Sequence, residues 1–562
     1  MMVRRFLRAA WVPLGFATLL HAAPMLRLAT SAVVPVPLPA GASGGTEIVE
    51  AYNAGDGSLS LSGNPTSSVS WIATSYGAPR ACTTTTASAT CIPIQLALNT
   101  SALAAGTYTG TVTVNGAANV VDAPQTITVT VRIGGVDVYV APGSSRDVSL
   151  TTNSSVTSVA TTQDGGRWLS LVVDGSGSFR FTYPYKIHVA PPAGVTSGTY
   201  TGSLAIGGSA LAADNQTIPV IMRVTTQPIA QASPDQVTAR LAQGAAPLAM
   251  QISLANLGQG SLTIGAVSAT TTDGGKWLTA SANSGGWAAI TLDPGTLAPG
   301  FYTGSVSIAS NAVNGTVTAP VSFQVVAKGA PLANYKGVVD NAIFGVGDTV
   351  NAVARGDIVD VFGEQFLFAN IAFSPGVPLA TQISGSSVMV NGRAAPLYFS
   401  KYDQIAFQVP METALGTAQV QVLRDGIAGN IISVQVVDRV PRILVITNPD
   451  GSLPSTAHPA KAGDTLVIWA IGLGPTNPAV GTNVPAPGSE PLARLIAMPS
   501  VEFGVGFFGS VSVTPDYAGL SPSSVGLYQV NAAVPQGVSS GLVNVTLVFS
   551  DGVSNSVQVA VQ

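Results

Sequence analysis

A short phrase that occurs three times is the feature that most constrains how this chain can fold. Each copy has the pattern Gly-x-Tyr-Thr-Gly and runs directly into residues that alternate between polar and apolar. A turn-forming Gly, a Tyr two residues later and a period of two predict a chain that turns a corner into a half-buried strand. A Leu or Val five residues before each Tyr completes the pattern of a tyrosine corner, a feature of Greek-key sandwiches. The corner residues are Tyr108, Tyr200 and Tyr302.

A tryptophan precedes each of these corners in the same order, as Trp71, Trp168 and Trp277. Successive tyrosines are 92 and 102 residues apart, which is the size of one seven-stranded immunoglobulin-like sandwich. We expect each Trp to pack between the two sheets of its sandwich. Repeats of this length are expected to be independent units that follow one another as a rod.

Asp-Gly-Gly precedes the second and third tryptophans and is a turn signal. The alternative is a recurring ion or ligand site at Asp164 and Asp273. One carboxylate per repeat is too few for calcium, which takes six to eight oxygen ligands, so the turn is favoured.

The three repeats resemble the bacterial immunoglobulin-like modules of secreted proteins, including those termed BACON-like. The resemblance rests on the Trp-Leu-Ser/Thr segment, the tyrosine phrase and the last strand of each repeat. It implies the fold. Carbohydrate or mucin binding, often proposed for BACON modules, is a hypothesis that comes with it.

The composition agrees with an all-β chain. Of the 562 residues, 46% are hydrophobic and only 9% are charged, and there are 61 Gly and 38 Pro. Such a chain consists of many short strands joined by tight turns. The low charge argues against a nucleic-acid partner, which requires a basic face.

The N-terminus has the features of a secretory signal. Arg4, Arg5 and Arg8 precede a short apolar run at 9–20, and small-residue cleavage sites follow near Ala22-Ala23 or at 30–32. The alternative, an uncleaved membrane anchor, would need a longer apolar run to span a bilayer. We therefore expect a secreted or cell-surface protein with no transmembrane segment in the mature chain.

The only two cysteines, Cys82 and Cys91, are nine positions apart. In an exported protein a close, isolated pair predicts a local disulfide. A metal site is disfavoured because no His or further Cys lies nearby to complete the ligand set.

Beyond residue 337 a different internal repeat appears. The segment 355–363 is echoed by 461–470, 404–410 by 529–535, and 430–436 by 554–562. Three matched phrases in the same order predict a duplicated pair of β-sandwiches. An Asn-Gly turn at 391–392 predicts a hairpin in the first of them.

This pair resembles the C-terminal domain that recurs in secreted proteins of Acidobacteria, the Solibacter type, with IPT/TIG-like loops. The residues that carry the resemblance are 351–357, 390–398, 404–410, 448–452, 458–463, 472–474 and 525–531. One departure is that 501–515 is richer in Phe and Gly than that pattern. The resemblance implies secretion and a modular C-terminal position.

The predicted organisation is therefore all-β, with tandem immunoglobulin-like sandwiches. Its parts are a signal peptide and cleavage region at 1–32, a linker at 33–45, sandwiches at 46–134, 135–227 and 228–328, a linker at 329–336, and two C-terminal halves at 337–438 and 439–562.

Catalytic chemistry is sparse in this sequence. His188 and His458 are far apart, whereas a Ser-His-Asp site needs its members within hydrogen-bond reach. Asp357 and Asp360 are three apart on one predicted strand, so they should face opposite sides. Asp357 recurs as Asp464, which favours a turn role. We predict no catalytic residue, no cofactor and no metal, and hence no enzymatic activity; a hydrolase with an unfamiliar site at His458 is the remaining alternative.

Aromatic residues near Gly- or Pro-bearing turns are the candidates for binding. Trp287, Tyr183 and Tyr185 are candidates for a ligand platform, as is the pair Phe507-Phe508, although such side chains more often fill cores. The predicted function is structural or adhesive, outside the cell or at its surface. The alternative is carbohydrate binding by loops of the N-terminal sandwiches. Glycans and other surface proteins are the candidate partners.

Overall fold

The computed structural model describes residues 24–562, apart from 56, 86–87, 118–119, 121, 175–182, 346–351, 457 and 505–508. In these residues the regular structure is β-strand, with one short 3-10 helix at Ala212–Asp214. The strands form ten sheets that pair into five sandwiches. The predicted all-β fold of tandem immunoglobulin-like sandwiches is confirmed.

Sandwich 1 has the strand order of an immunoglobulin domain, with its first edge strand split between the two sheets. One sheet has the order β1 (Leu26–Leu28), β3 (Thr46–Asn53), β7 (Thr90–Leu98) and β5 (Ile72–Tyr76), and β6 (Arg80–Ala81) also pairs with β7. The other has the order β2 (Ala32–Val33), β9 (Gln125–Ile133), β8 (Gly106–Val114) and β4 (Thr66–Ser67), with β2 parallel to β9.

Sandwich 3 repeats this plan, and sandwich 2 repeats it without a counterpart of β1 among the described residues. In sandwich 2 one sheet has the order β10 (Val136–Val140), β16 (Thr217–Val224), β15 (Gly198–Gly207) and β12 (Thr157–Thr162). The other sheet has the order β11 (Arg146–Thr152), β14 (Tyr183–Val189) and β13 (Leu169–Val173). In sandwich 3 one sheet has the order β17 (Ala230–Ser233), β19 (Leu248–Asn256), β22 (Trp287–Leu292) and β21 (Leu278–Ala282). The other sheet has the order β18 (Val237–Ala242), β24 (Val317–Val326), β23 (Gly300–Ser310) and β20 (Ile264–Thr271).

Half A of the C-terminal pair contains two five-stranded sheets. The first has the order β25 (Leu332–Asp340), β27 (Ile358–Glu364), β32 (Gln404–Gln408), β31 (Leu397–Ser400) and β28 (Ala372–Phe373). The second has the order β26 (Ala352–Ala354), β34 (Ile427–Val437), β33 (Gly416–Arg424), β29 (Ser386–Val390) and β30 (Arg393–Ala394). β29 and β30 form the predicted hairpin, with Asn391 and Gly392 both at positive φ.

Half B contains a six-stranded and a five-stranded sheet. The six-stranded sheet has the order β35 (Arg442–Thr447), β36 (Thr465–Ile471), β42 (Tyr528–Ala533), β41 (Tyr517–Leu520), β38 (Arg494–Leu495) and β37 (Thr476–Asn477). The five-stranded sheet has the order β40 (Val511–Val513), β39 (Ser500–Gly504), β43 (Gly541–Phe549) and β44 (Gly552–Val553), and β45 (Val557–Val561) also pairs with β43. The echoed phrases fall on equivalent strands, since β27 lies between β25 and β32 as β36 lies between β35 and β42.

The recurrent tyrosines lie near the start of β8, β15 and β23, and Tyr108 and Tyr302 form the hydroxyl bond of the predicted corner. The Tyr108 hydroxyl donates to the Ala104 carbonyl at 3.1 Å, and the Tyr302 hydroxyl donates to the Ala298 carbonyl at 2.8 Å. The ring of Tyr200 packs edge-on against a buried Trp, with the centroids 6.4 Å apart. These bonds tie the strand to the chain just before it.

The last glycine of each phrase is required by the same packing. A Cβ at Gly202 would lie 2.7 Å from the Thr161 carbonyl oxygen and 3.3 Å from the ring of Trp168. A Cβ at Gly304 would lie 2.6 Å from the Thr270 carbonyl oxygen. The Trp segment and the Tyr phrase are far apart in the sequence, yet they form one packing unit in the structure.

The predicted linker at 33–45 is wrong. Residues 32–33 form β2 of sandwich 1, and the Leu38 N–H donates to the Arg132 carbonyl at 2.8 Å. Val36 is 2% exposed and lies in the core of sandwich 2. This segment runs along the unpaired edge of β11, where the Thr151 N–H donates to the Val34 carbonyl at 2.6 Å. It occupies the place of an outer strand that sandwich 2 lacks.

The N-terminal boundary and the second linker also differ from the prediction. Residues 1–23 lie outside the described residues, but Leu26 is fully buried in the core of sandwich 1 and β1 pairs with β3. Cleavage after Ala32 would therefore remove a strand of the sheet. In the predicted linker 329–336, residues from Leu332 onward belong to β25, where Leu332 pairs with Glu364.

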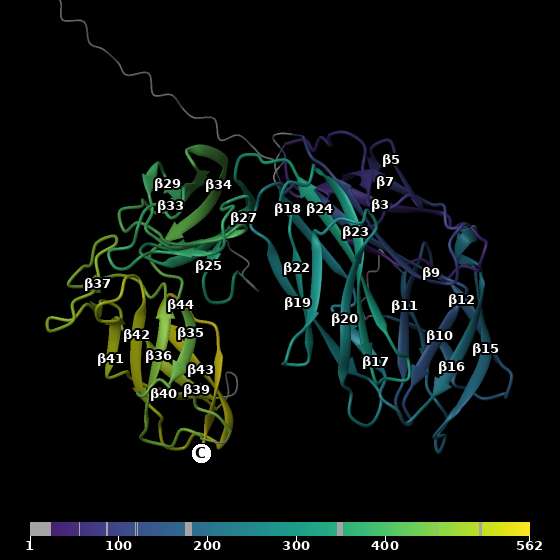
Figure 1. The fold of residues 1–562 in the computed structure, drawn as a ribbon. Coiled ribbons are helices and arrows are strands. Elements are labelled where there is room, and N and C mark those ends of the chain that lie inside the picture. Colours follow the sequence, from purple (N-terminus) through teal and green to yellow (C-terminus); the bar gives the residue numbers. More distant parts are fainter. Residues whose placement is uncertain are drawn as a thin grey trace, which may run out of the picture.

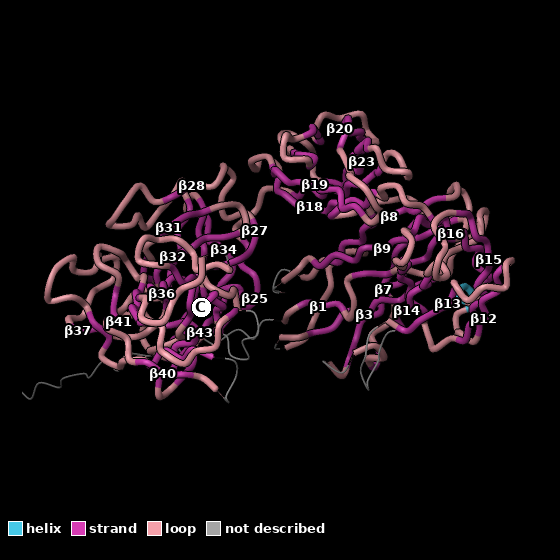
Figure 2. The backbone as a smooth tube through the Cα atoms, turned by 90° about the horizontal axis from the view of Figure 1, so that it is seen from below, coloured by secondary structure: helices cyan, strands magenta, loops and turns pink. Residues whose placement is uncertain are grey.

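The expectation of a rod of independent units is also wrong. Figure 1 shows an arch, with the N-terminal sandwiches on the right and the C-terminal pair on the left, and Figure 2 shows the same two groups from below. Sandwich 3 contacts sandwich 1, where the Thr113 hydroxyl lies 3.5 Å from Gln324 Oε1. Sandwich 3 also contacts half A, because the Ala242 N–H donates to the Tyr402 hydroxyl at 2.8 Å. The chain folds back on itself.

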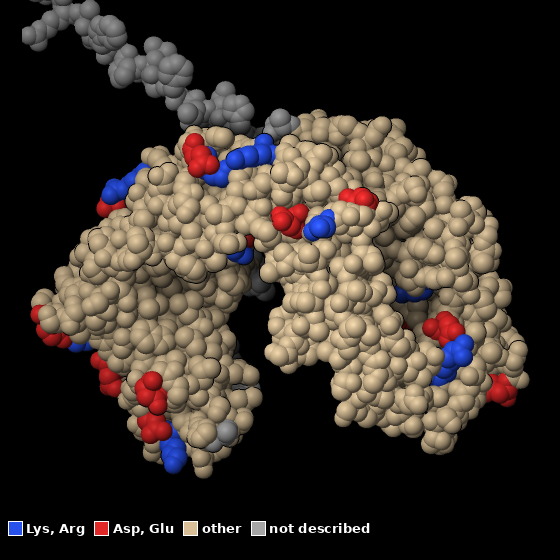
Figure 3. Space-filling view, in the orientation of Figure 1, with Lys and Arg blue, Asp and Glu red and all other residues tan. Residues whose placement is uncertain are grey.

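The surface is mostly uncharged. In Figure 3 the few charged side chains on the visible face are scattered, several of them beside a side chain of opposite charge. Arg223 and Asp137, for example, form two hydrogen bonds of 2.9 Å. The described residues include no helix with the length and hydropathy needed to cross a bilayer.

Candidate interaction site

The recurrent carboxylates of the Asp-Gly-Gly motif hold the buried tryptophans in place. Asp164 Oδ1 accepts the Gly166 N–H and the Trp168 indole N–H, each at 3.0 Å. Asp273 makes the same contacts, with the Trp277 indole N–H at 3.1 Å. The backbone bond and the indole bond lower the pKa of both carboxyl groups. The motif is therefore a turn, as predicted, and its carboxylate orients the buried tryptophan.

The predicted aromatic platform is not brought together. Tyr185 is 8% exposed in the core of sandwich 2, and its hydroxyl accepts the Val156 N–H at 3.2 Å. Tyr183 is partly buried against the same core. Trp287 is partly buried at the start of β22, in sandwich 3. Tyr185 is thus a core residue, and Phe507-Phe508 lies outside the described residues.

His188 and His458 lie in different sandwiches. His188 in β14 pairs with Asp147 of the neighbouring β11, at 2.7 Å between Nδ1 and Oδ1. His458 closes a tight turn of half B, in which its backbone exchanges hydrogen bonds of 3.1 and 3.0 Å with Ser455. This position fits the predicted turn role. The two side chains cannot act in one site.

The duplicated carboxylates Asp357 and Asp464 have the same local role. Asp357 Oδ2 accepts the Ala354 N–H at 3.4 Å, and Asp464 Oδ2 accepts the Lys461 N–H at 2.8 Å. Asp357 closes the turn before β27, and Asp464 closes the turn before β36. Asp464 is exposed, whereas Asp357 is fully buried, and burial raises the pKa of Asp357 to about 8.

Half B is what buries Asp357. A Cβ at Gly472 would lie 3.0 Å from Asp357 Oδ2, so the Gly-Leu-Gly segment of half B lies against this carboxyl group. Nearby, the Tyr398 hydroxyl of half A donates to the Val525 carbonyl of half B at 2.6 Å. Asp360, expected on the opposite face, is also buried, and burial raises its pKa to about 6 although Gln404 donates to it. These carboxyl groups belong to the interior of the pair.

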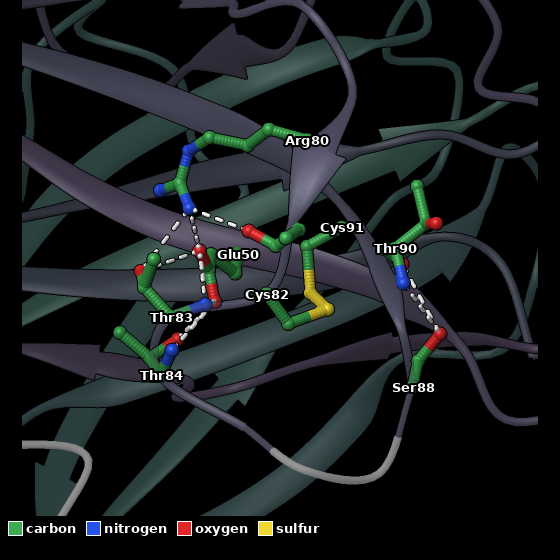
Figure 4. Close-up of a disulfide and its surroundings, with 9 residues drawn as sticks. Glu50, Arg80, Cys82, Thr83, Thr84, Ser88, Thr90 and Cys91 are labelled. Atoms are coloured by element: carbon green, nitrogen blue, oxygen red, sulfur yellow. Dashed lines mark hydrogen bonds and ion pairs between the residues drawn. A yellow bond between two sulfur atoms is a disulfide. The ribbon is translucent and has the colours of Figure 1, made fainter.

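The predicted disulfide is present, with an S–S distance of 2.03 Å between Cys82 and Cys91. Figure 4 shows Glu50 beside it, facing Arg80, Thr83 and Thr84. Each threonine donates its backbone N–H and its hydroxyl to Glu50, and the Arg80 guanidinium lies 2.6 Å from the carboxylate.

This environment makes Glu50 a structural anion rather than a metal ligand. Burial would raise the pKa of Glu50, but the hydrogen bonds from Thr84 and Thr83 outweigh burial and lower it to about 2. Glu50 and the two sulfurs are close enough to share an ion, but both sulfurs are committed to the disulfide and offer no thiolate. The sequence signal for Glu50 is a charged residue at an apolar position of a strand, in a chain with few charges.

A polar cleft lies between sandwiches 1 and 3, at one junction of the arch. Its volume is about 160 Å³. Its polar walls are formed by Thr111, Thr113, Thr126, Thr238, Ser322 and Gln324. Arg240 also lines it, and the Arg240 guanidinium pairs with Glu364 of half A at 3.3 Å. Within the described residues the buried Arg240 Nε has no hydrogen-bond partner.

Such a cleft can hydrogen-bond a small polar molecule through hydroxyl groups and one cationic donor. The sequence did not indicate it because its walls come from segments about two hundred residues apart, although Phe301, which also lines it, belongs to the third tyrosine phrase. Only the folding back of sandwich 3 onto sandwich 1 creates it.

Comparison with known proteins gives no family. No family model and no curated protein matches the chain. Similar solved structures include an endo-fucoidan hydrolase of glycoside hydrolase family 107 (12% identity, 54% of this chain and 45% of that chain, TM-score 0.15). Another is a three-domain immunoglobulin segment of titin (10% identity, 54% of this chain and 99% of that chain, TM-score 0.14). A third is the extracellular domain of protocadherin gamma B4 (15% identity, 96% of this chain and 84% of that chain, TM-score 0.15).

This chain spans less than half of the length of the hydrolase. At these TM-scores the likenesses support no function, and the fold is assigned from the strand order of the sandwiches themselves.

Proposed function

We propose that this chain is an exported, non-enzymatic protein with a structural or adhesive role at the cell surface or outside the cell. The observation that carries the proposal is the set of contacts that join non-consecutive sandwiches into an arch. Asp122 of sandwich 1, for example, accepts the Tyr335 N–H of half A, and its carboxylate is held by Arg27 of the same sandwich at 2.5 Å. Fixed junctions suit a protein that bears or transmits load more than one that needs a moving active site.

Export is supported by the Arg-rich apolar N-terminus and by the disulfide, since disulfides persist in oxidising compartments. The resemblance of the C-terminal pair to the Solibacter-type secreted domain belongs to the same proposal. The sandwich 1 core favours cleavage near Ala23 over cleavage after Ala32, and the mass of the mature chain distinguishes the two.

The test is a surface-attachment assay with a strain that lacks this chain. Attachment or envelope integrity should fall and return when the full chain is supplied in trans. An unchanged strain would overturn the adhesive and structural role. Release of sugars from polysaccharides by purified protein, abolished in His458→Ala, would overturn the non-enzymatic part and restore the hydrolase alternative.

Carbohydrate binding is the second candidate, and the polar cleft is the observation that favours it. Threonine hydroxyls and a guanidinium can hydrogen-bond sugar hydroxyl or carboxylate groups. The candidate site of this second proposal is therefore the junction between sandwiches 1 and 3 and not the loops of the N-terminal sandwiches. A flat glycan array with folded protein would remove this candidate without affecting the first.

A further inference from the structure

Strand β12 of sandwich 2 is an exposed sheet edge. It is the last strand of its four-stranded sheet and pairs only with β15. Five of its six residues are exposed, and Val159 is 66% exposed. Figures 1 and 2 both place β12 at the outer end of the N-terminal arm, on the side away from the C-terminal pair.

Two residues of β12 direct their backbone polar groups outward. The hydrogen bond from the Gln163 N–H to the Thr201 carbonyl, at 3.0 Å, fixes the alternation along the strand. The odd-numbered residues bond to β15, so the N–H and C=O groups of Ser158 and Ala160 point away from the sheet. Across the described part of the chain these groups have no hydrogen-bond partner.

The edge lacks the features that usually protect such strands. Proteins commonly shorten exposed edges, charge them, or distort them with bulges or Pro. The corresponding strand of sandwich 1, β4, has only two residues, and β20 of sandwich 3 has a register shift between Ile264 and Val267. β12 reads Thr-Ser-Val-Ala-Thr-Thr, with regular register and no charge or Pro.

We propose that β12 pairs with β12 of a second copy of this chain, antiparallel about a two-fold axis through Val159. In this register Ser158 of one copy and Ala160 of the other exchange both backbone hydrogen bonds. The side chains on the outer face also match: Val159 meets Val159, and Thr157 meets Thr161. A neutral strand meets its own copy without the like-charge repulsion that edge charges would cause.

The occupant is a second copy because the strand is complementary to itself in one register. An isologous contact of this kind closes at a dimer and joins two four-stranded sheets into one. Few hydrogen bonds and a small buried area make the pairing weak, so it should depend on concentration. The inference stands whether the role of the protein is adhesive or structural.

Cysteine cross-linking tests the register. Both native cysteines are in the disulfide, so an added Cys is the only free thiol. Val159→Cys should form a disulfide-linked dimer under mild oxidation, because the two copies of residue 159 face each other. Thr157→Cys and Thr161→Cys should cross-link strongly only when mixed. Val173→Cys, on the adjacent exposed strand β13, is the matched control and should remain monomeric.

Sedimentation equilibrium tests the association without a cross-link. The average mass of the wild type should rise toward twice the monomer value with concentration, and Val159→Lys should stay monomeric. Val173→Lys should behave as the wild type. The proposal is overturned if the wild type stays monomeric and Val159→Cys does not cross-link, or if the Val173 variants behave as the Val159 variants do.

Discussion

At the scale of single residues, the glycine that lies against each buried tryptophan leaves no room for a side chain. Gly202→Ala would place a Cβ 2.7 Å from the Thr161 carbonyl oxygen. We expect it to lower the free energy of unfolding of sandwich 2 by about 1–3 kcal/mol, because backbone or ring must shift. Urea unfolding followed by Trp fluorescence measures this.

Gly207→Ala is the matched control, because Gly207 lies on the same strand as Gly202 and a Cβ there would have no atom within 4 Å. It should be neutral or slightly stabilising, since Ala restricts the unfolded chain more than Gly does. Equal losses in both variants would contradict the packing explanation.

The sequence predicted the recurring residues, the cysteine pair and the Asn-Gly hairpin, and it missed a residue whose partners follow no pattern. Tyr108 and the tryptophans were predictable because each sandwich needs the same corner and the same core. Tyr185 was placed on a surface platform because nearby Pro and Gly suggest a turn, but it alternates inward on β14. Glu50 was missed because its partners, Thr83 and Thr84, come from the disulfide loop and follow no period.

At the scale of elements, the segment between β2 and β3 has a dual role. Val36→Ala should destabilise sandwich 2 by about 2 kcal/mol, since it removes buried methyl groups from that core. Hydrogen exchange should become faster in β11 and β14 and remain slow in β8. Val173→Ala, the same change at an exposed site of sandwich 2, should leave exchange unchanged. Faster exchange confined to sandwich 1 would contradict the assignment.

The junction of sandwiches 1 and 2 should respond to pH. Asn153 Nδ2 lies 3.3 Å from Glu47 of β3 and 3.4 Å from Asp214 of sandwich 2. Burial, and then the charge of Asp214, raise the pKa of Glu47 from 4.5 to about 7. The folded chain therefore binds this proton more tightly than the unfolded chain.

The contribution of Glu47 to stability is then most favourable below about pH 4.5 and is lost as the pH rises to about 7. Glu47→Gln imitates the protonated form. Its free energy of unfolding should match the wild type at low pH and exceed it by up to about 3 kcal/mol above pH 7. A difference that does not change with pH, in urea titrations across this range, would contradict this account.

At the scale of the whole molecule, the arch should be compact in solution. Small-angle scattering at low concentration should give a maximum dimension well below that of five sandwiches end to end. Asp122→Ala removes the pair with Arg27 and the bond to Tyr335, so it should lengthen the particle. A wild-type profile that already fits an extended rod would contradict the folded-back arrangement.

The sequence could not predict the arch for a physical reason. Its contacts, such as Thr113 with Gln324 and Ala242 with Tyr402, join residues that have no periodicity and no special composition. Repeat length indicates how many sandwiches there are, whereas their arrangement depends on single polar pairs at the junctions.

The insertion of Val36 into sandwich 2 also affects how this architecture can be inherited. A repeat is usually regarded as a cassette that can be copied or moved by itself. Here a domain boundary at Gly134-Gly135 would separate sandwich 2 from the segment that contains Val34 and Val36. Sandwich 2 would then have an unpaired edge at β11 and a cavity in its core where Val36 packs. The smallest transferable cassette at this end of the chain is therefore the first two sandwiches together, and a gene fusion that keeps only the second should yield an insoluble product.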